Sequence, residues 1–209
     1  MSEKIICEKH DCKRKKLIRA ILAGIVVFVI LVLFVILLIW LILRPTSPQF
    51  MLQDVTVYQF NVTSPNFLTS TIQVTVSSRN PNDKIGIYYD KLDIYATYRN
   101  QQFTLPTLLL PTYEGHKDIN VWSPFLSGNS VPIAPYLATA LNEDQSAGFV
   151  LINVKLYGKL RWKVGTWISG HYRINVKCPA YIRFGNPGSG VTFHTGIKYT
   201  LSQSCGTDI

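Results

Sequence analysis

Two kinds of side chain alternate along the stretch Val150-Leu151-Ile152-Asn153-Val154-Lys155-Leu156-Tyr157-Gly158-Lys159-Leu160-Arg161-Trp162-Lys163-Val164. The even positions are apolar except for one glycine, whereas the odd positions from 155 onward carry lysine, tyrosine or arginine. A period of two is typical of a β-strand, whose successive side chains point to opposite faces of the sheet. The stretch therefore predicts a long strand with one face in a hydrophobic core and a basic face in water.

The next segment repeats this period and predicts a neighbouring strand. The side chains expected in the core are Tyr172, Ile174, Val176 and Cys178, and those expected in water are His171, Arg173, Asn175 and Lys177. Residues 165–170 begin and end with glycine and form the predicted connection. The two strands are therefore expected to pair as an antiparallel hairpin.

Shorter alternating runs occupy the chain before this hairpin. They are Phe50 to Val62, Ile72 to Val76, Leu92 to Tyr98 and Ile119 to Trp122. Asn80 to Asp83 predicts a turn, because residues before proline avoid the helical region and Asn and Asp side chains bond to nearby backbone. Arg99 to Gln102 predicts a hairpin connection, and Ile133 to Leu141 a short helix with Pro135 in its first turn. Seven or more short strands at this spacing predict an all-β fold, an antiparallel β-sandwich with one short helix.

The most apolar part of the chain lies near its N-terminus. Residues 20–43 carry no charge and consist almost entirely of Ile, Leu, Val, Phe and Ala. At about 1.5 Å per residue a helix of this length measures roughly 36 Å, against about 30 Å for the hydrocarbon core of a bilayer. The run is longer than the roughly 7–15 apolar residues of a signal peptide and ends without a small-residue cleavage site. We expect a retained, single transmembrane helix with membrane lipid as its partner.

Charge sets the expected orientation and the domain organisation. The span is preceded by Lys4, Lys9, Lys13, Arg14, Lys15, Lys16 and Arg19, whereas Arg44 is the one basic residue that closely follows it. The positive-inside bias therefore predicts a cytosolic N-terminus. The predicted organisation is a basic cytosolic tail over residues 1–19, the span over 20–43, a linker over 44–49 and a folded domain over 50–209 outside the cytosol.

The cysteines fall into two pairs on opposite sides of the predicted membrane. Cys7 and Cys12 lie in the cytosolic tail close to the bilayer, where reversible palmitoylation is the hypothesis. With His10 they offer three potential zinc ligands, whereas a structural zinc site normally has four. Cys178 and Cys205 lie outside the cytosol, where disulfides persist. A bridge between them is predicted, with two free buried thiols as the alternative.

A single N-glycosylation motif, Asn61-Val62-Thr63, lies in the part of the chain that is predicted to be translocated. This makes Asn61 the candidate glycosylation residue. So short a motif also occurs by chance, so its use is a hypothesis.

The C-terminal part of the chain is basic. Between Gln145 and Thr207 there are lysines and arginines but no acidic residue. Two interpretations stay open: a solvated face whose lysines prevent edge pairing, or an electropositive surface for acidic cell-wall polysaccharide or lipid headgroups. The candidate binding residues are Lys155, Lys159, Arg161, Lys163, Arg173 and Lys177. Nucleic acid is disfavoured as a partner because the domain is expected outside the cytosol.

The sequence contains no pattern that is typical of catalysis. His10, His116, His171 and His194 are isolated, and the nucleophile, zinc-protease and P-loop motifs are missing. The glycine-rich segment 185–190 contains a proline and leads into a strand-like run, so no helix N-terminus follows it to hold a phosphate. We expect a turn there and a protein that is not an enzyme and has no cofactor or metal.

Three further segments share one resemblance. They are Asn80-Pro81-Asn82-Asp83-Lys84-Ile85-Gly86-Ile87-Tyr88-Tyr89-Asp90, Pro124-Phe125-Leu126-Ser127-Gly128 and Tyr157-Gly158-Lys159-Leu160-Arg161-Trp162-Lys163-Val164-Gly165. Together with the preceding span they resemble the motifs of the plant harpin-induced-like, or non-race-specific disease resistance-like, family. These are membrane-anchored relatives of the late-embryogenesis-abundant group 2 proteins. Ser123 stands where the second motif usually has a proline.

The resemblance implies a fold, a location and a role. The fold is a fibronectin-III or immunoglobulin-like β-sandwich, located at the plasma membrane or its plasmodesmata. The role is in plant immunity, through protein partners in immune signalling or through the cell wall, and it includes no catalytic residue. The alternative is a stress-protective protein that binds lipid or stabilises membranes during dehydration. Within the first motif Tyr88 and Tyr89 point to opposite faces of a strand, so we expect no more than one of them in the core.

Overall fold

A computed structural model describes residues 2–43, 45–63, 65–183 and 196–209, and the chain divides into two units, Met1–Arg44 and Pro45–Ile209. The first unit is the helix α1 (Ser2–Leu43). Its segment Leu17–Leu38 has a mean hydropathy of 3.6 and is long and apolar enough to cross a membrane. The side chains of Cys7 and Cys12 lie outside the described residues.

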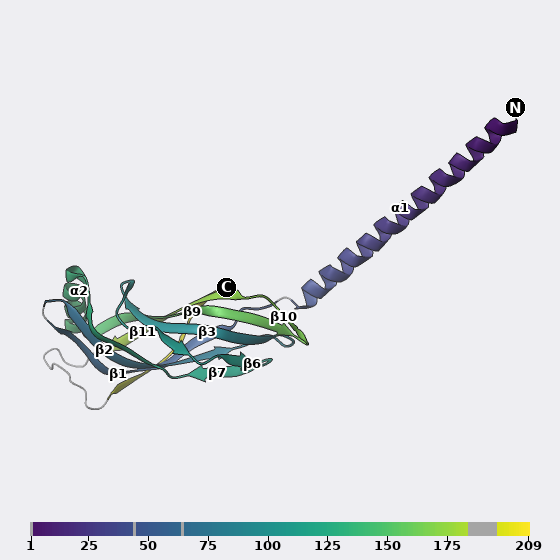
Figure 1. Ribbon diagram of the computed structural model, residues 1–209. Helices are drawn as coiled ribbons and strands as arrows, with labels where there is room; N and C mark the ends of the chain where they lie inside the picture. Colours follow the sequence, from purple (N-terminus) through teal and green to yellow (C-terminus); the bar gives the residue numbers. More distant parts are fainter. Residues whose placement is uncertain (1, 44, 64, 184–195) are drawn as a thin grey trace. The chain divides into compact units, whose positions relative to one another are not determined.

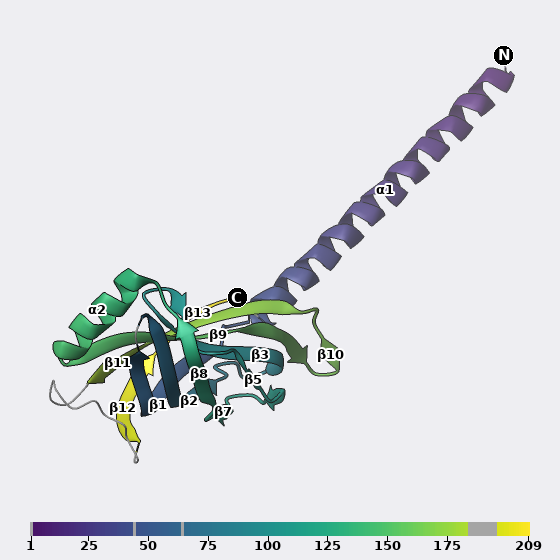
Figure 2. The ribbon, with the colours of Figure 1, turned by 60° about the vertical axis from the view of Figure 1, so that its left-hand side comes forward.

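The second unit consists of two antiparallel sheets and one helix (Figures 1 and 2). The smaller sheet has the order β12-β1-β2-β7, and β8 also pairs with β2. The larger sheet has the order β13-β11-β9-β3-β4, with β10 on β9 and with β5 and β6 on β3. The predicted all-β antiparallel sandwich is therefore confirmed.

The strands have the following bounds. The smaller sheet contains β1 (Gln49–Thr63), β2 (Phe67–Arg79), β7 (Ile119–Trp122), β8 (Phe125–Pro132) and β12 (Ile197–Ser204). The larger sheet contains β3 (Gly86–Tyr98), β4 (Gln101–Gln102), β5 (Thr107–Leu109), β6 (Thr112–Glu114), β9 (Phe149–Val164), β10 (Trp167–Ile168), β11 (Tyr172–Arg183) and β13 (Gly206–Asp208).

The predicted alternation positions the core. Along β9 every even residue from Val150 to Trp162 is buried, and β11 buries Ile174, Val176 and Cys178. The inward prediction for Tyr172 is wrong, since its side chain is 47% exposed. Tyr172 is the first residue of β11, and alternation determines which face a residue is on but not how far the core extends along the strand.

The helix α2 (Pro135–Ser146) begins and ends later than the predicted range of Ile133 to Leu141. Ala134 is extended, with ψ 140°, because the residue before a proline avoids the helical region. Gly148, with φ 89°, follows the helix in the left-handed conformation that commonly ends one. Leu137 and Leu141 are buried, so one face of α2 joins the core, at the end of the sandwich away from β10 (Figures 1 and 2).

Residues with positive φ form the turns in two connections between neighbouring strands. Arg99 and Asn100 both have positive φ, of 43° and 70°, as a two-residue hairpin turn requires. A hairpin forms as predicted, but its connection is shorter than Arg99 to Gln102, because Gln101 and Gln102 already pair with β3 as the strand β4. Between β9 and β11 the chain turns at Gly165, with φ 57°, and adds the short strand β10 before it returns. The antiparallel β9–β11 pairing is confirmed over Tyr172–Arg183. The predicted turn at residues 185–190 lies outside the described residues.

Gly158 is explained by a close backbone contact. The register between β3 and β9 shifts between Tyr89 and Lys91, which leaves Asp90 as the extra residue of a β-bulge. Beside the bulge, a Cβ on Gly158 would overlap the carbonyl oxygen of Lys91. A side chain at position 158 is therefore incompatible with this pairing of the two strands.

Candidate functional site

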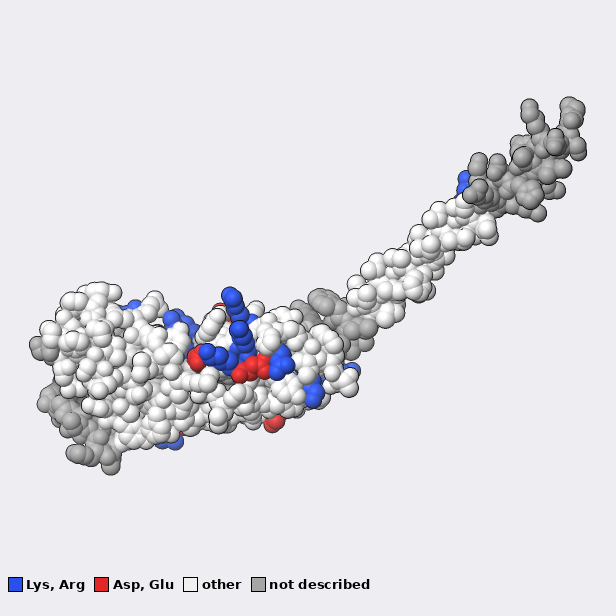
Figure 3. Space-filling model, in the orientation of Figure 1, with Lys and Arg blue, Asp and Glu red and all other residues white. Residues whose placement is uncertain are grey.

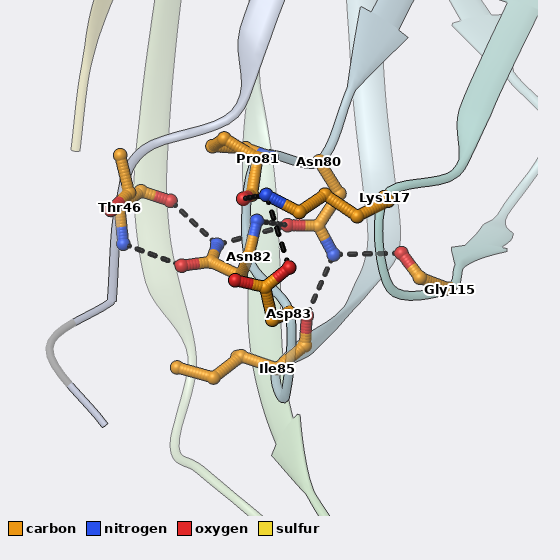
Figure 4. A network of polar contacts seen from close by, with 8 residues as sticks. All are labelled: Thr46, Asn80, Pro81, Asn82, Asp83, Ile85, Gly115 and Lys117. Atoms are coloured by element: carbon orange, nitrogen blue, oxygen red, sulfur yellow. Dashed lines mark hydrogen bonds and ion pairs between the residues drawn. The ribbon is translucent and has the colours of Figure 1, made fainter. Parts of the chain in front are cut away.

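Asn80 and Asn82 of the first motif join three chain segments (Figure 4). Asn80 is fully buried, and its Nδ2 donates to the carbonyl oxygens of Ile85, at 2.7 Å, and Gly115, at 2.8 Å. The backbone N–H of Thr46 donates to Asn82 Oδ1 at 2.9 Å, and Asn82 Nδ2 donates back to the Thr46 carbonyl at 2.8 Å. We call this arrangement the asparagine cluster. It fixes the first residues of the second unit to the turn before β3.

The loop that carries Gly115 closes the asparagine cluster from its other side. Lys117 donates from its backbone N–H to the carbonyl of Asn82 and from its Nζ to the carbonyl of Pro81. Lys117 Nζ also lies 3.1 Å from a carboxylate oxygen of Asp83 (Figure 4). These contacts satisfy backbone polar groups of a partly buried turn, so Asn80, Pro81 and Asn82 specify the fold.

Tyr89, the inward tyrosine of the first motif, contacts a buried acid. Its Oη donates to Glu114 Oε2 at 2.7 Å, and Ser78 Oγ donates to the same oxygen at 3.0 Å. All three side chains are buried, and Glu114 Oε1 has no hydrogen-bond partner among the described residues. Burial raises the pKa of Glu114, and the two hydrogen bonds oppose that change. Burial also raises the pKa of Tyr89. The negative charge of Glu114 raises it further.

Tyr88 and Asp90, which flank Tyr89, point to the outer face of the larger sheet and meet residues of the third motif. Asp90 accepts two hydrogen bonds from Arg161, at 2.7 Å from Nε and 2.5 Å from Nη2. Lys163 Nζ lies 3.4 Å from Tyr88 Oη and 5.1 Å from the ring centre of Tyr113. We call Tyr88, Asp90, Tyr113, Arg161 and Lys163 the motif cluster.

The motif cluster is held in one geometry by several contacts at once. The rings of Tyr88 and Tyr113 lie 4.5 Å apart, and Arg161 lies 5.6 Å from the centre of the Tyr88 ring. The hydrogen bonds to Asp90 raise the pKa of Arg161. His171 Nε2 lies 3.5 Å from the same carboxylate. As the extra residue of the bulge, Asp90 has no direct partner on β9, which leaves its carboxylate free to reach Arg161 across the strands.

The predicted basic face divides into engaged and free cations. Arg161 and Lys163 belong to the motif cluster, where Asp90 pairs with Arg161 and the rings of Tyr88 and Tyr113 lie beside Lys163, so their binding of a polyanion stays a prediction. In the part of the chain that the structure describes, no acidic side chain pairs with the other four candidates, Lys155, Lys159, Arg173 and Lys177. Acidic side chains nevertheless share the face, as Figure 3 shows, because Asp90 and Asp93 lie on β3 and Asp208 on β13.

Two of these four cations, Lys155 and Lys177, line a hollow of about 250 Å³ on the outer face. Its lining residues come from four neighbouring strands and are Tyr95, Lys155, Leu156, Tyr157, Asn175, Val176, Lys177 and Asp208. Lys155 faces Tyr95 on one side and Lys177 on the other, and Asn175 faces both Tyr157 and Asp208. The hollow thus combines two aromatic rings with two cations, an amide and a carboxylate.

Cys178 and Cys205, which the sequence predicts as a pair, form a disulfide with their Cα atoms 4.4 Å apart. Cys205 lies between β12 in the smaller sheet and β13 in the larger one. Its backbone N–H also donates to the carbonyl of Phe50 at 3.0 Å. The bridge therefore fixes the point at which the C-terminal segment crosses from one sheet to the other.

The candidate glycosylation residue lies in the smaller sheet, apart from the outer face of the larger one. Asn61 is exposed near the end of β1 and pairs with Thr69 in the smaller sheet. His194 lies outside the described residues. Among the residues that are described, no three His, Cys, Asp or Glu side chains gather where they could hold a metal ion.

Several members of these sites were not predicted from the sequence. Tyr113 and Glu114 lie on the three-residue strand β6, which is too short for its alternation to be recognised. Tyr95 lies in a predicted strand, but its neighbours across the sheet follow from the strand order, which the pattern does not give. Asp208 stands near the C-terminus, far in sequence from the lysines beside it.

The chain is similar to a known protein family and to several plant proteins. A family model described as "Late embryogenesis abundant protein" matches residues 75–179. Over 206 residues the chain is 54% identical to NDR1/HIN1-like protein 1 of Arabidopsis thaliana, covering 97% of this chain and 99% of that protein. Over 207 residues it is 52% identical to NDR1/HIN1-like protein 12 of the same plant, covering 97% and 98%. NDR1/HIN1-like protein 26 is 47% identical over 148 residues, or 70% of each chain.

Two solved structures are similar over about two thirds of the chain. One is a protein from Archaeoglobus fulgidus, with 12% identity over 65% of this chain and 99% of that one and a TM-score of 0.35. The other is a putative late embryogenesis abundant protein solved in solution, with 16% identity over 66% and 71% and a TM-score of 0.33.

Proposed function

Because the chain belongs to the NDR1/HIN1-like family of late embryogenesis abundant proteins, we propose that it is a non-enzymatic, membrane-anchored protein of plant defence whose outer domain binds a protein partner. In this proposal α1 spans the plasma membrane with its N-terminus in the cytosol. The second unit is on the outer side, and the partner contacts the motif cluster.

The motif cluster is the observation that carries the proposal. Tyrosine and arginine are enriched among the residues that contribute most to binding at protein interfaces. Tyr113 is 40% exposed, and the partly buried Arg161 is already held by Asp90, so little side-chain freedom remains to be lost on binding. Leu108 and Leu110, in the segment of β5 and β6 beside the cluster, are exposed apolar side chains. An aromatic and charged centre beside apolar residues is typical of a protein-binding surface.

The motif residues fall into two groups, those that the fold explains and those that it does not. Asn80, Asn82 and Tyr89 are buried and explained by the fold. Tyr88, Asp90 and Lys163 lie on the outer face, where folding alone does not call for an arrangement of stacked rings and cations. This contrast favours the motif cluster, and not the asparagine cluster, as the binding site.

The experiment is complementation of loss-of-function plants with full-length variants. Tyr113→Ser removes one exposed ring and leaves the Asp90–Arg161 pair intact, and Tyr181→Ser removes a similarly exposed tyrosine from the far end of β11 as the matched control. Under bacterial challenge, the proposal expects Tyr181→Ser to restore resistance and Tyr113→Ser to fail. Equal rescue by both variants would refute the motif cluster as the site that binds the partner.

The same plants distinguish the role in defence from the dehydration role. If loss of the protein changes survival under drought but leaves bacterial growth unchanged, the stress-protective alternative replaces the proposal. The proposal expects loss of the protein to increase bacterial growth and to leave survival under drought unchanged.

A further inference from the structure

We propose that the hollow between β3, β9, β11 and β13 binds a chain of carboxylated sugars, with Lys155 and Lys177 holding a carboxylate and Tyr95 and Tyr157 contacting the sugar rings. This inference is independent of the protein partner proposed for the motif cluster. It rests on the side chains that the hollow brings together and on the charges that the fold leaves unpaired.

The first argument is the charge on two neighbouring strands. Lys155 on β9 and Lys177 on β11 are direct cross-strand partners. Like charges in this position repel each other and destabilise a sheet. In the described chain neither ammonium group has an ion-pair partner, although six other ion pairs are formed. An anionic group between the two lysines would convert this repulsion into attraction.

The second argument is that the repulsion recurs further along the same two strands, beyond the Tyr157–Asn175 pair. Lys159 and Arg173 are also direct partners on β9 and β11, and neither has an acidic partner among the described residues. Lys155 and Lys159 are four residues apart, which is about 13 Å along a strand. A single small anion therefore reaches one pair of cations, whereas a chain with regularly spaced anionic groups reaches both.

The third argument identifies the ligand as a sugar. Tyr157 is 43% exposed, and with Tyr95 it borders the hollow with flat apolar surface that suits the C–H face of a sugar ring. Asn175 both donates and accepts hydrogen bonds, and Asp208 accepts them, which suits neutral hydroxyl groups. The negative charge of Asp208 would repel a densely charged polyphosphate. A volume of about 250 Å³ lies below the usual range for a drug-sized ligand and suits one sugar ring at a time.

The test measures binding of the full-length protein, in lipid nanodiscs, to immobilised de-esterified pectin. Fully methyl-esterified pectin has the same sugar chain without the carboxylate charge, and polyphosphate has charge without sugar. The site variant is Lys155→Gln with Lys177→Gln. The matched control, Lys117→Gln with Lys198→Gln, removes the same net charge from lysines that are paired with Asp83 and Asp54.

At physiological salt, the proposal expects the site variant to bind de-esterified pectin at least tenfold more weakly and the control to change by less than twofold. Esterified pectin should bind weakly to every variant. Tyr157→Ser should weaken pectin binding without weakening any binding of polyphosphate. Tyr113→Ser, in the motif cluster, should bind pectin as the unmodified protein does, so the two proposals fail separately.

Three results would overturn the inference. Equal losses in the site variant and the control would mean that net charge alone attracts the polymer. Equal binding of esterified pectin would remove the role of the carboxylate. Binding of polyphosphate as tight as that of pectin, with no effect of Tyr157→Ser, would show a general anion surface in place of a sugar site.

Discussion

Asp90 on β3 and Arg161 on β9 are joined by two parallel hydrogen bonds, of 2.7 and 2.5 Å, although the two residues are not register partners. The contact exists because Asp90 is the extra residue of a β-bulge, which re-aims its side chain. It links the first motif to the third and thereby organises the outer face. The neighbouring Lys91–Asp93 pair, with one contact at 3.3 Å, is a simpler ion pair on the same strand.

Arg161→Lys tests whether the geometry of this pair matters beyond its charge. Lysine keeps the positive charge but cannot donate two parallel hydrogen bonds to one carboxylate. We expect the melting temperature of the full-length protein to fall by a few degrees, measured by circular dichroism. Lys91→Ala is the comparison, and it should have a smaller effect because an exposed single pair contributes little. A larger effect of Lys91→Ala would contradict this account of the outer face.

Cys205→Ser tests the disulfide. The bridge closes a separation of 27 residues, and the chain-entropy model assigns such a loop about 3.5 kcal/mol of stabilisation. Denaturant unfolding without reductant should show a loss of that order. The unmodified protein in reductant should match the variant, whereas an unchanged midpoint would mean that the crossing between the sheets does not depend on the bridge.

Gly158→Ala tests the close approach of β3 and β9. The added methyl group would overlap the carbonyl oxygen of Lys91, which is backbone and cannot rotate away. The expected loss in free energy of unfolding is about 2–3 kcal/mol, as for other overpacked positions. Gly170→Ala is the matched control, because a Cβ there meets no atom within 4 Å, and it should change stability by less than about 0.5 kcal/mol. Similar losses in both variants would contradict the argument.

Glu114→Gln tests the buried acid by its effect on the pH dependence of stability. Burial raises the pKa of Glu114 in the folded state, so the folded protein holds this proton to a higher pH than the unfolded chain does. The free energy of unfolding therefore falls as the pH rises through the ordinary carboxyl pKa towards the raised one. Glutamine carries no titrating proton, so the variant should show a weaker fall as the pH rises above the ordinary carboxyl pKa of about 4.3.

The control for this prediction is Glu143→Gln, which removes a carboxylate from the exposed face of α2. It separates the effect of the buried position from the effect of losing one charge. If Glu114→Gln leaves the pH dependence unchanged, Glu114 is not the group that holds the proton.

The long strands were predictable from the sequence because alternation is a local signal. Residues 150–164 need no distant partner to show which face is buried, and β9 follows that prediction along its length. β5, β6 and β13 have three residues each, and they are strands because β3 and β11 lie beside them. Their alternation is too short to be recognised before the pairing is known.

Of the candidate site, only the basic residues were predictable from the sequence. Counting charges along residues 145–207 finds the lysines and arginines but misses every acid that another strand contributes. Asp90 neutralises Arg161 from β3, and Asp208 reaches the hollow from β13. The bulge that re-aims Asp90 depends on the pairing of β3 with β9, so no pattern within one strand reveals it.

The direct test of the central claim, a membrane anchor with the sandwich outside the cytosol, is protease protection. Sealed plant microsomal vesicles with their cytosolic face outward would carry the full-length protein with a different tag at each end. The account predicts that protease removes the N-terminal tag and leaves the C-terminal tag intact until detergent is added. A mass shift from glycosylation should disappear in Asn61→Gln. A C-terminal tag that is digested in sealed vesicles, on a chain without glycan, would contradict the account.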